Sequence, residues 1–161
     1  MNREEKIIQI RKCIEANHYP LEFDPCSRRA DNCYAYMLGA SFHDTDSKGF
    51  IYNLGAISRI KYPPFSLSDA EEAFISDMDV LGIDCKKCSY ERPLLPNEWK
   101  AVLFYDDQFS DSFDFHFIRQ NIGGIWSHQE GIWGGVHSLK GNLQNVSELT
   151  FVGFFVLKVR K

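Results

Sequence analysis

The chain has 161 residues, of which 44% are hydrophobic, 14% aromatic and 25% charged. This composition is typical of a globular protein and excludes a disordered or low-complexity chain, and the length suits one domain. The net charge is −4 at pH 7, so we expect no nucleic acid and no membrane as a partner.

The first 17 residues predict an amphipathic helix. Asn2 and Glu5 have the spacing of a capping box, in which each side chain binds the backbone N–H of the other residue. An apolar stripe recurs close to helical spacing, and it consists of Ile7, Ile8, Ile10 and Ile14. Charged residues interrupt the segment, so it is neither a secretory signal nor a membrane span.

Targeting and redox state follow from the same pattern. We expect a chain made in the cytoplasm without a signal peptide; leaderless export, and delivery by a phage or as an effector, are left open. The five cysteines, an odd number, do not suggest a regular set of disulfides, and reduced thiols in a cytosol are the simpler interpretation.

A loop from His18 to Asp31 precedes a second predicted helix. Asp31 or Asn32 caps this helix, and Gly39 suits its end. Residues 44–65 contain glycine and proline signals, which predict a loop with short extended pieces.

A third helix is predicted from a capping box at Ser68 and Glu71 to about Leu81, with Gly82 ending it. Its predicted buried face consists of Ala70, Phe74, Met78 and Leu81.

Residues 83–98 are predicted to be a connector. Cys85 and Cys88 within it have the spacing of a zinc-ligand pair, but a structural zinc site needs four ligands and no second pair of this kind is present. We interpret them as two loop thiols and expect no metal and no other cofactor.

The second half of the chain predicts an antiparallel sheet. A hairpin signal at 120–124 separates two of the strands. The predicted strands are 101–105, which is apolar throughout and therefore central, and 113–118, 125–128 and 150–159. Helices followed by such a sheet predict an α+β fold.

Cys33 lies in the first turn of the second predicted helix, where a nucleophilic thiol would be favoured. A helix N-terminus stabilises negative charge, so it favours the thiolate, and its free N–H groups suit an oxyanion. The alternative is a buried, inert cysteine.

His116 and His128 are the candidate partners of this thiol. Period-two alternation sets His116 on the face opposite Phe115 and Phe117, where it can act as a general base. His128 lies across the predicted hairpin, directly opposite His116 if the turn is centred on Ile122, and it can then orient the His116 ring. Structural or surface histidines are the alternatives.

The order of cysteine at a helix start, histidine on a strand and polar residue on the next strand resembles the papain-like cysteine hydrolase superfamily. The stretch from His116 to His128 is similar to the pattern of NlpC-type cell-wall peptidases, with CHAP-type amidases nearby. The resemblance implies one papain-like domain over 1–161, with residues 1–24 as N-terminal helix and lead-in and 25–161 as catalytic core.

The resemblance also implies a mechanism. Cys33 would be the nucleophile, His116 the general base and His128 the orienting residue of a hydrolase that cleaves an amide bond through an acyl-enzyme. The substrate would be a peptide or protein, with peptidoglycan-type peptide as the first guess. Two alternatives are a cysteine deamidase or acyltransferase acting on a protein or lipid, and a non-catalytic interaction or immunity protein.

Three further residues are candidates for substrate binding. Tyr34 and Trp126 would wall the cleft, and core packing is their alternative. Arg29 would hold a substrate carboxylate or lower the pKa of the Cys33 thiol, and solvated surface charge is its alternative.

Overall fold

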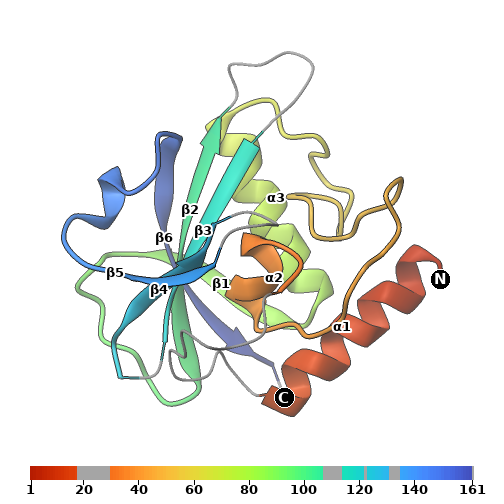
Figure 1. The fold of residues 1–161 in the computed structure, drawn as a ribbon, viewed down its shortest axis with the longest axis horizontal. Coiled ribbons are helices and arrows are strands. Elements are labelled where there is room, and N and C mark those ends of the chain that lie inside the picture. The colour runs from red at the N-terminus through yellow and green to blue at the C-terminus, as the bar shows by residue number, and fades with distance from the viewer. Residues whose placement is uncertain (18–29, 107–113, 122, 131–134, 161) are drawn as a thin grey trace.

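The structure is a computed structural model that describes residues 1–17, 30–106, 114–121, 123–130 and 135–160. Within them, three helices come first, α1 (Arg3–Asn17), α2 (Cys33–Leu38) and α3 (Leu67–Val80). Six strands and a short 3₁₀ helix follow, β1 (Ile83–Cys88), β2 (Glu98–Asp106), β3 (Asp114–Gln120), β4 (Trp126–Gln129), β5 (Val136–Leu139), η1 (Leu143–Asn145) and β6 (Thr150–Val159). The strands form one sheet in the order β1-β6-β2-β3-β4-β5, and all neighbours are antiparallel (Figure 1). The predicted α+β class is confirmed.

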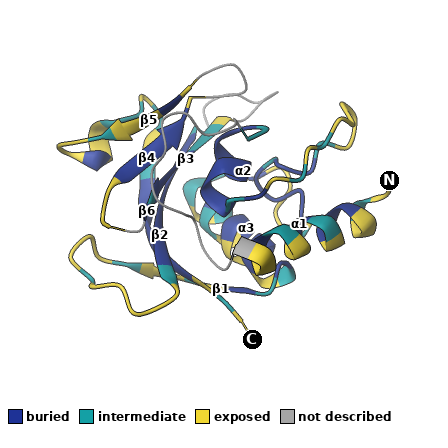
Figure 2. Cartoon of the chain, turned by 60° about the horizontal axis from the view of Figure 1, so that its bottom comes forward, coloured by how far each residue is buried: buried dark blue, intermediate teal, exposed yellow. Residues whose placement is uncertain are grey.

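The sheet has a different core on each face. The three helices cover one face and bury a large apolar core with the strands, which we call the helix-side core (Figure 2). A smaller core, the opposite core, lies on the other face and includes Leu143 of η1. β2 contributes to both, since Leu103 belongs to the first and Phe104 to the second. Burial on both faces explains why this strand is apolar along most of its length.

The first helix begins as predicted. The N–H of Asn2 donates to Glu5 Oε2 at 2.8 Å, and the N–H of Glu5 donates to Asn2 Oδ1 at 2.9 Å, so the capping box is formed in both directions. Ile7, Ile10 and Ile14 are buried in the helix-side core. Ile8 was wrongly included in the buried stripe, because its side chain is 50% exposed.

Lys6 ties α1 to the loop that follows α2. Its ammonium group is buried and lies 3.1 Å from Asp44 Oδ2, 3.2 Å from Asp46 Oδ2 and 2.8 Å from the carbonyl oxygen of Gly49. The N–H of Asp44 in turn donates to Asp31 Oδ2 at 2.7 Å. The first helix is therefore linked, through two carboxylates, to the turn that precedes Cys33.

Two predictions for the middle of the chain are corrected. The cap of α3 is Ser66 rather than Ser68, and its hydroxyl accepts the N–H of Asp69 at 3.0 Å. Residues 83–88 are the strand β1 instead of a connector, because they pair along their length with β6. The paired residues lie 66 to 76 positions apart in the chain, so no local signal in residues 83–88 reports the pairing.

Strand β1 contains Cys85 and Cys88, so the two thiols belong to a strand and not to a loop. Successive side chains of a strand point to opposite faces, so residues three apart face away from each other. Accordingly, Cys85 packs against the helix-side core and Cys88 against the opposite core. Both thiols are free, and they cannot bind one metal ion together.

The remaining strands lie close to the predicted ranges, with one addition. The central position of β2 and the long final strand β6 are confirmed. β5 was not predicted, and it pairs His137 directly with His128 of β4. In the described part of the chain, no helix is both long enough and apolar enough to cross a membrane.

Candidate active site

The turn before α2 places Cys33 at the first helical position. Asn32 is extended at its N-cap, and its side-chain oxygen accepts the N–H groups of Tyr34 at 3.0 Å and Ala35 at 3.1 Å. The Asn32 amide group also donates to the carbonyl oxygen of Tyr52 at 2.8 Å. Gly39 ends the helix with a φ of 67°, a left-handed conformation that glycine adopts without strain. The cap and the end predicted for this helix are confirmed.

The Cys33 thiol lies against the backbone of β3. Backbone N–H groups of Phe117, Tyr34 and Cys33 itself point at the sulfur and favour its thiolate. Burial outweighs them and raises the pKa of the thiol to about 12, since Cys33 is only 4% exposed. The sequence predicted a lowered pKa, and this is corrected: a six-residue helix terminus does not compensate for removing a thiolate from water.

The Cys33 thiol lies beside a part of β3 that is not paired with the neighbouring strand β4. β3 pairs with β2 along its whole length but with β4 only through Arg119 and Gln120. In an antiparallel sheet an N–H that does not bond one neighbour points to the other side. The N–H of Phe117 lies near Cys33, on the part of β3 that is not paired with β4.

His116 and His128 meet across the two diverging strands. His116 Nε2 lies 2.7 Å from His128 Nδ1, and the two rings are nearly perpendicular, at 81°. Burial, and then the neighbouring His128, lower the pKa of His116 to about 4. Burial also lowers the pKa of His128, with Glu130 opposing the shift and His137 adding to it. Both imidazoles are therefore neutral at pH 7.

The strand register differs from the prediction by one residue at the turn. The observed pairs are Arg119 with Ser127 and Gln120 with Trp126, so the turn is centred on Gly123 and not on Ile122. Extending this register sets His128 opposite Ile118, two residues beyond His116. The two histidines are therefore diagonal neighbours on one face, which keeps them in contact.

The thiol and the imidazole pair approach this part of β3 from different sides. Phe117 lies in the helix-side core together with Cys33, while His116 points the other way, toward Phe104 of the opposite core. Among the described residues, His116 forms its hydrogen bond through Nε2, and no hydrogen bond joins its ring to the Cys33 thiol. His116 is nevertheless the chain neighbour of Phe117, whose N–H points at the sulfur.

One residue that the sequence analysis missed holds the nucleophile turn in place. Gln129, fully buried on β4 next to His128, accepts the N–H of Ala30 and donates to its carbonyl oxygen, both at 2.9 Å. Tyr36 on α2 makes a second link, since its hydroxyl lies 2.6 Å from Ser127 Oγ on the same strand. In the sequence, the position of Gln129 directly after His128 is the only feature that could have indicated this role.

Two of the three predicted substrate-binding residues, Tyr34 and Trp126, lie away from the candidate site. Tyr34 is fully buried, and its hydroxyl donates to Asp77 Oδ2 at 2.8 Å, so it packs in the helix-side core and does not line a cleft. Trp126 is 7% exposed in the opposite core and stacks on Tyr90 with ring centroids 6.2 Å apart. Arg29 lies outside the described residues.

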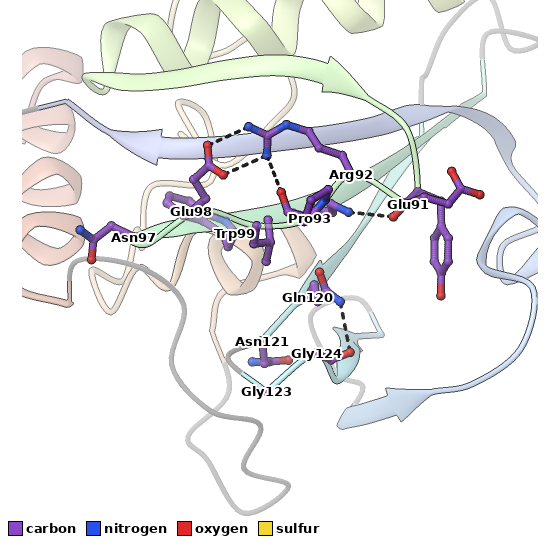
Figure 3. A pocket seen from close by; sticks show the side chains of 13 residues that line it. Glu91, Arg92, Pro93, Asn97, Glu98, Trp99, Gln120, Asn121, Gly123 and Gly124 are labelled. Carbon is purple, nitrogen blue, oxygen red and sulfur yellow. Dashed lines mark hydrogen bonds and ion pairs between the residues drawn. The ribbon is translucent and has the colours of Figure 1, made fainter.

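A surface pocket of about 600 Å³ lies at the other end of β2 and β3, between the β1–β2 connection and the β3–β4 turn (Figure 3). Arg92 and Glu98 line it as an ion pair with contacts of 2.9 and 3.2 Å, and Arg92 lowers the pKa of Glu98. Lys100 in its wall pairs with Gln120, four residues along β3 from His116, a separation of about 13 Å. We therefore treat the pocket as separate from the histidine pair.

Within the described residues, no group of three or more His, Cys, Asp or Glu side chains has an arrangement that could hold a metal ion. Comparisons with protein-family models, with curated proteins and with solved structures found no match to the chain.

Proposed function

We propose that the protein is a papain-like cysteine hydrolase that cleaves an amide bond through an acyl-enzyme. The observation that carries the proposal is the part of β3 that is not paired with β4: the Cys33 thiol lies near the backbone of Phe117 there, and the preceding residue, His116, is hydrogen-bonded to His128 of β4. Candidate nucleophile and candidate base thus lie on neighbouring parts of the fold, and the reaction requires the Cys33 thiol and the His116 ring to come within hydrogen-bond reach of each other when substrate binds.

The reaction would proceed in two balanced steps. The Cys33 proton passes to His116 Nδ1 as the sulfur bonds to the substrate carbonyl carbon, and the N–H of Cys33 stabilises the oxyanion. The C–N bond breaks, and His116 returns the proton to the leaving amine. Water then attacks the thioester with His116 as base, which releases the acid and restores the thiol.

The pKa values define the resting state of this mechanism. With the pKa of the thiol raised to about 12 and that of His116 lowered to about 4, both groups are neutral at pH 7. The proton therefore moves during the attack, and no thiolate–imidazolium pair exists beforehand. A bound substrate assists because its polar carbonyl replaces some of the solvation that burial removes from the sulfur.

The substrate class follows from the family resemblance alone. We propose a peptide-like amide, with peptidoglycan-type peptide as the first substrate to test. Transfer of the acyl group to another nucleophile, or deamidation, uses the same first step and differs only in the released product.

A second candidate function is supported by the burial of Cys33. A thiol that is 4% exposed, with a pKa near 12, is also what an inert core cysteine shows. The rival is a non-catalytic interaction protein, in which the histidine pair only contributes to packing.

A peptide with a carbonyl electrophile distinguishes the two candidates. We expect a covalent adduct on Cys33 by mass spectrometry in the wild type and its loss in His116→Gln, with hydrolysis of peptidoglycan-type peptides falling at least about 10²-fold in the same variant. Cys13→Ala is the matched control, because that thiol is half-buried on α1 and accepts from Ser41 Oγ at 3.3 Å. No adduct on Cys33, with folded protein shown by thermal unfolding, would establish the non-catalytic alternative.

A further inference from the structure

The hydrogen bond between His116 and His128 can form with either ring as the donor, and the two arrangements differ in the tautomer of each ring. Only one proton can lie between His116 Nε2 and His128 Nδ1 at 2.7 Å when both rings are neutral. If His128 donates it, His116 carries its own proton on Nδ1 and cannot accept one from a thiol. If His116 donates it, its Nδ1 is bare and can act as a base.

A carboxylate lies at the far nitrogen of His128. Glu130 Oε1 is 3.6 Å from His128 Nε2, a distance at which the interaction is electrostatic and not a direct hydrogen bond. A negative charge there favours the proton on Nε2, because the N–H dipole then points at it. His128 Nδ1 is thereby left as an acceptor, and the shared proton belongs to His116.

We infer that Glu130 is a positioning residue that sets the tautomers of both histidines and so leaves His116 Nδ1 unprotonated. The inference rests on the proposed function for its catalytic meaning, but the tautomers themselves are independent of any substrate. The Glu130 carboxylate favours His128 protonated on Nε2. His128 Nδ1 then accepts the Nε2 proton of His116, and His116 Nδ1 stays free to accept the thiol proton.

The other groups around His128 do not supply this bias. His116 faces it from β3, and the ring of His137 on β5 has its centroid 6.3 Å away. Both are imidazoles that match either tautomer of His128. Glu130, which directly follows β4, is the acidic group in contact with His128 among the described residues.

The test is nitrogen NMR of the histidine side chains at pH 8, where both imidazoles are neutral. In the wild type we expect His128 and His116 to carry their protons on Nε2. Glu130→Ala should give His128 a measurable population protonated on Nδ1, and kcat should fall about tenfold with KM unchanged. Glu72→Ala is the control, since Glu72 is an exposed residue of α3 on the helix face of the sheet and should change neither readout.

The outcomes separate this inference from the function on which it rests. A wild-type His128 protonated on Nδ1, or an unchanged tautomer in Glu130→Ala, overturns the role of Glu130 even if Cys33 is essential. Conversely, unchanged turnover in Cys33→Ala removes the proposed function, and the tautomers measured in that same variant still decide the role of Glu130.

Discussion

Asp77 on the helix side of the sheet is fully buried and His116 on the opposite side is half-buried, and burial shifts the pKa of both groups toward their neutral forms. Asp77 is fully buried and accepts hydrogen bonds from the Tyr34 hydroxyl and from the N–H groups of Gly55 and Ser58. Burial raises its pKa to about 6, although these donors oppose the shift. His116 has a pKa lowered to about 4, and its hydrogen-bond partner in the described residues is another titratable group, His128.

The difference between the two sites indicates their roles. The donors to Asp77 are two backbone N–H groups of one loop and the Tyr34 hydroxyl of α2, so the carboxylate links these two parts of the fold. The imidazole of His116 is held through one nitrogen by a group that can exchange protons with it. A buried carboxylate held by several donors is typical of scaffold, and a half-buried imidazole whose partner is a second imidazole is typical of proton transfer.

The largest expected effect comes from removing the acceptor at Asp77. Asp77→Ala leaves the Tyr34 hydroxyl and two backbone N–H groups without partners in the helix-side core. We expect the free energy of unfolding to fall by about 4 kcal/mol, measured in urea. A loss below about 1 kcal/mol would show that Asp77 does not organise this region.

The two groups should make stability respond to pH with opposite signs. The folded-state pKa of His116 is lowered from 6.5 to about 4, so its contribution is complete above pH 6.5 and is lost as the pH falls through 4. That loss amounts to about 3 kcal/mol. His116→Gln should remove this decline, which urea unfolding at several pH values between 4 and 7 would measure.

Asp77 should show the reverse dependence in the same pH window. Its folded-state pKa is raised from 3.8 to about 6, so its contribution is complete below pH 3.8 and is lost as the pH rises through 6. The stability difference between wild type and Asp77→Asn should therefore shrink by about 3 kcal/mol from low to neutral pH. A difference that grows with pH would contradict the raised pKa.

A smaller effect is expected at the cap before the candidate nucleophile. Asn32→Ala removes the acceptor of two N–H groups and the donor to the Tyr52 carbonyl oxygen. We expect a loss of about 2 kcal/mol in thermal or urea unfolding. Asn32→Asp keeps the acceptor and should recover roughly half, which would not occur if the site only required a small side chain.

Mild oxidation of the protein is expected to leave the two thiols of β1 without a disulfide between them. Cys85 and Cys88 point to opposite faces of the strand, so they should form no mutual disulfide. Mass spectrometry of the oxidised, alkylated protein would detect a bridge between them as a peptide that carries neither alkyl group and is two mass units lighter than its reduced form.

Local signals carried most of what the sequence could predict. The cap at Asn32 and the end at Gly39 are encoded within one short segment, and so is the alternation that sets His116 and His128 on the same face. β1 and β5 depend on distant partners, and the buried contact between Gln129 and Ala30 joins residues 99 apart. The burial that raises the pKa of Cys33 is likewise a property of the assembled core.

The ammonium of Lys6 acts in this protein much as a bound cation does in other loops, since oxygens of Asp44, Asp46 and Gly49 converge on it. Lys6 belongs to α1, so the negative charges of the loop that contains Asp44 and Asp46 are balanced only when that helix is packed in place. Without the helix, the sequestered Asp44 carboxylate would face a neighbouring acid with no counterion. Helix α1 thus stabilises, through Asp44 and Asp31, the turn that precedes Cys33.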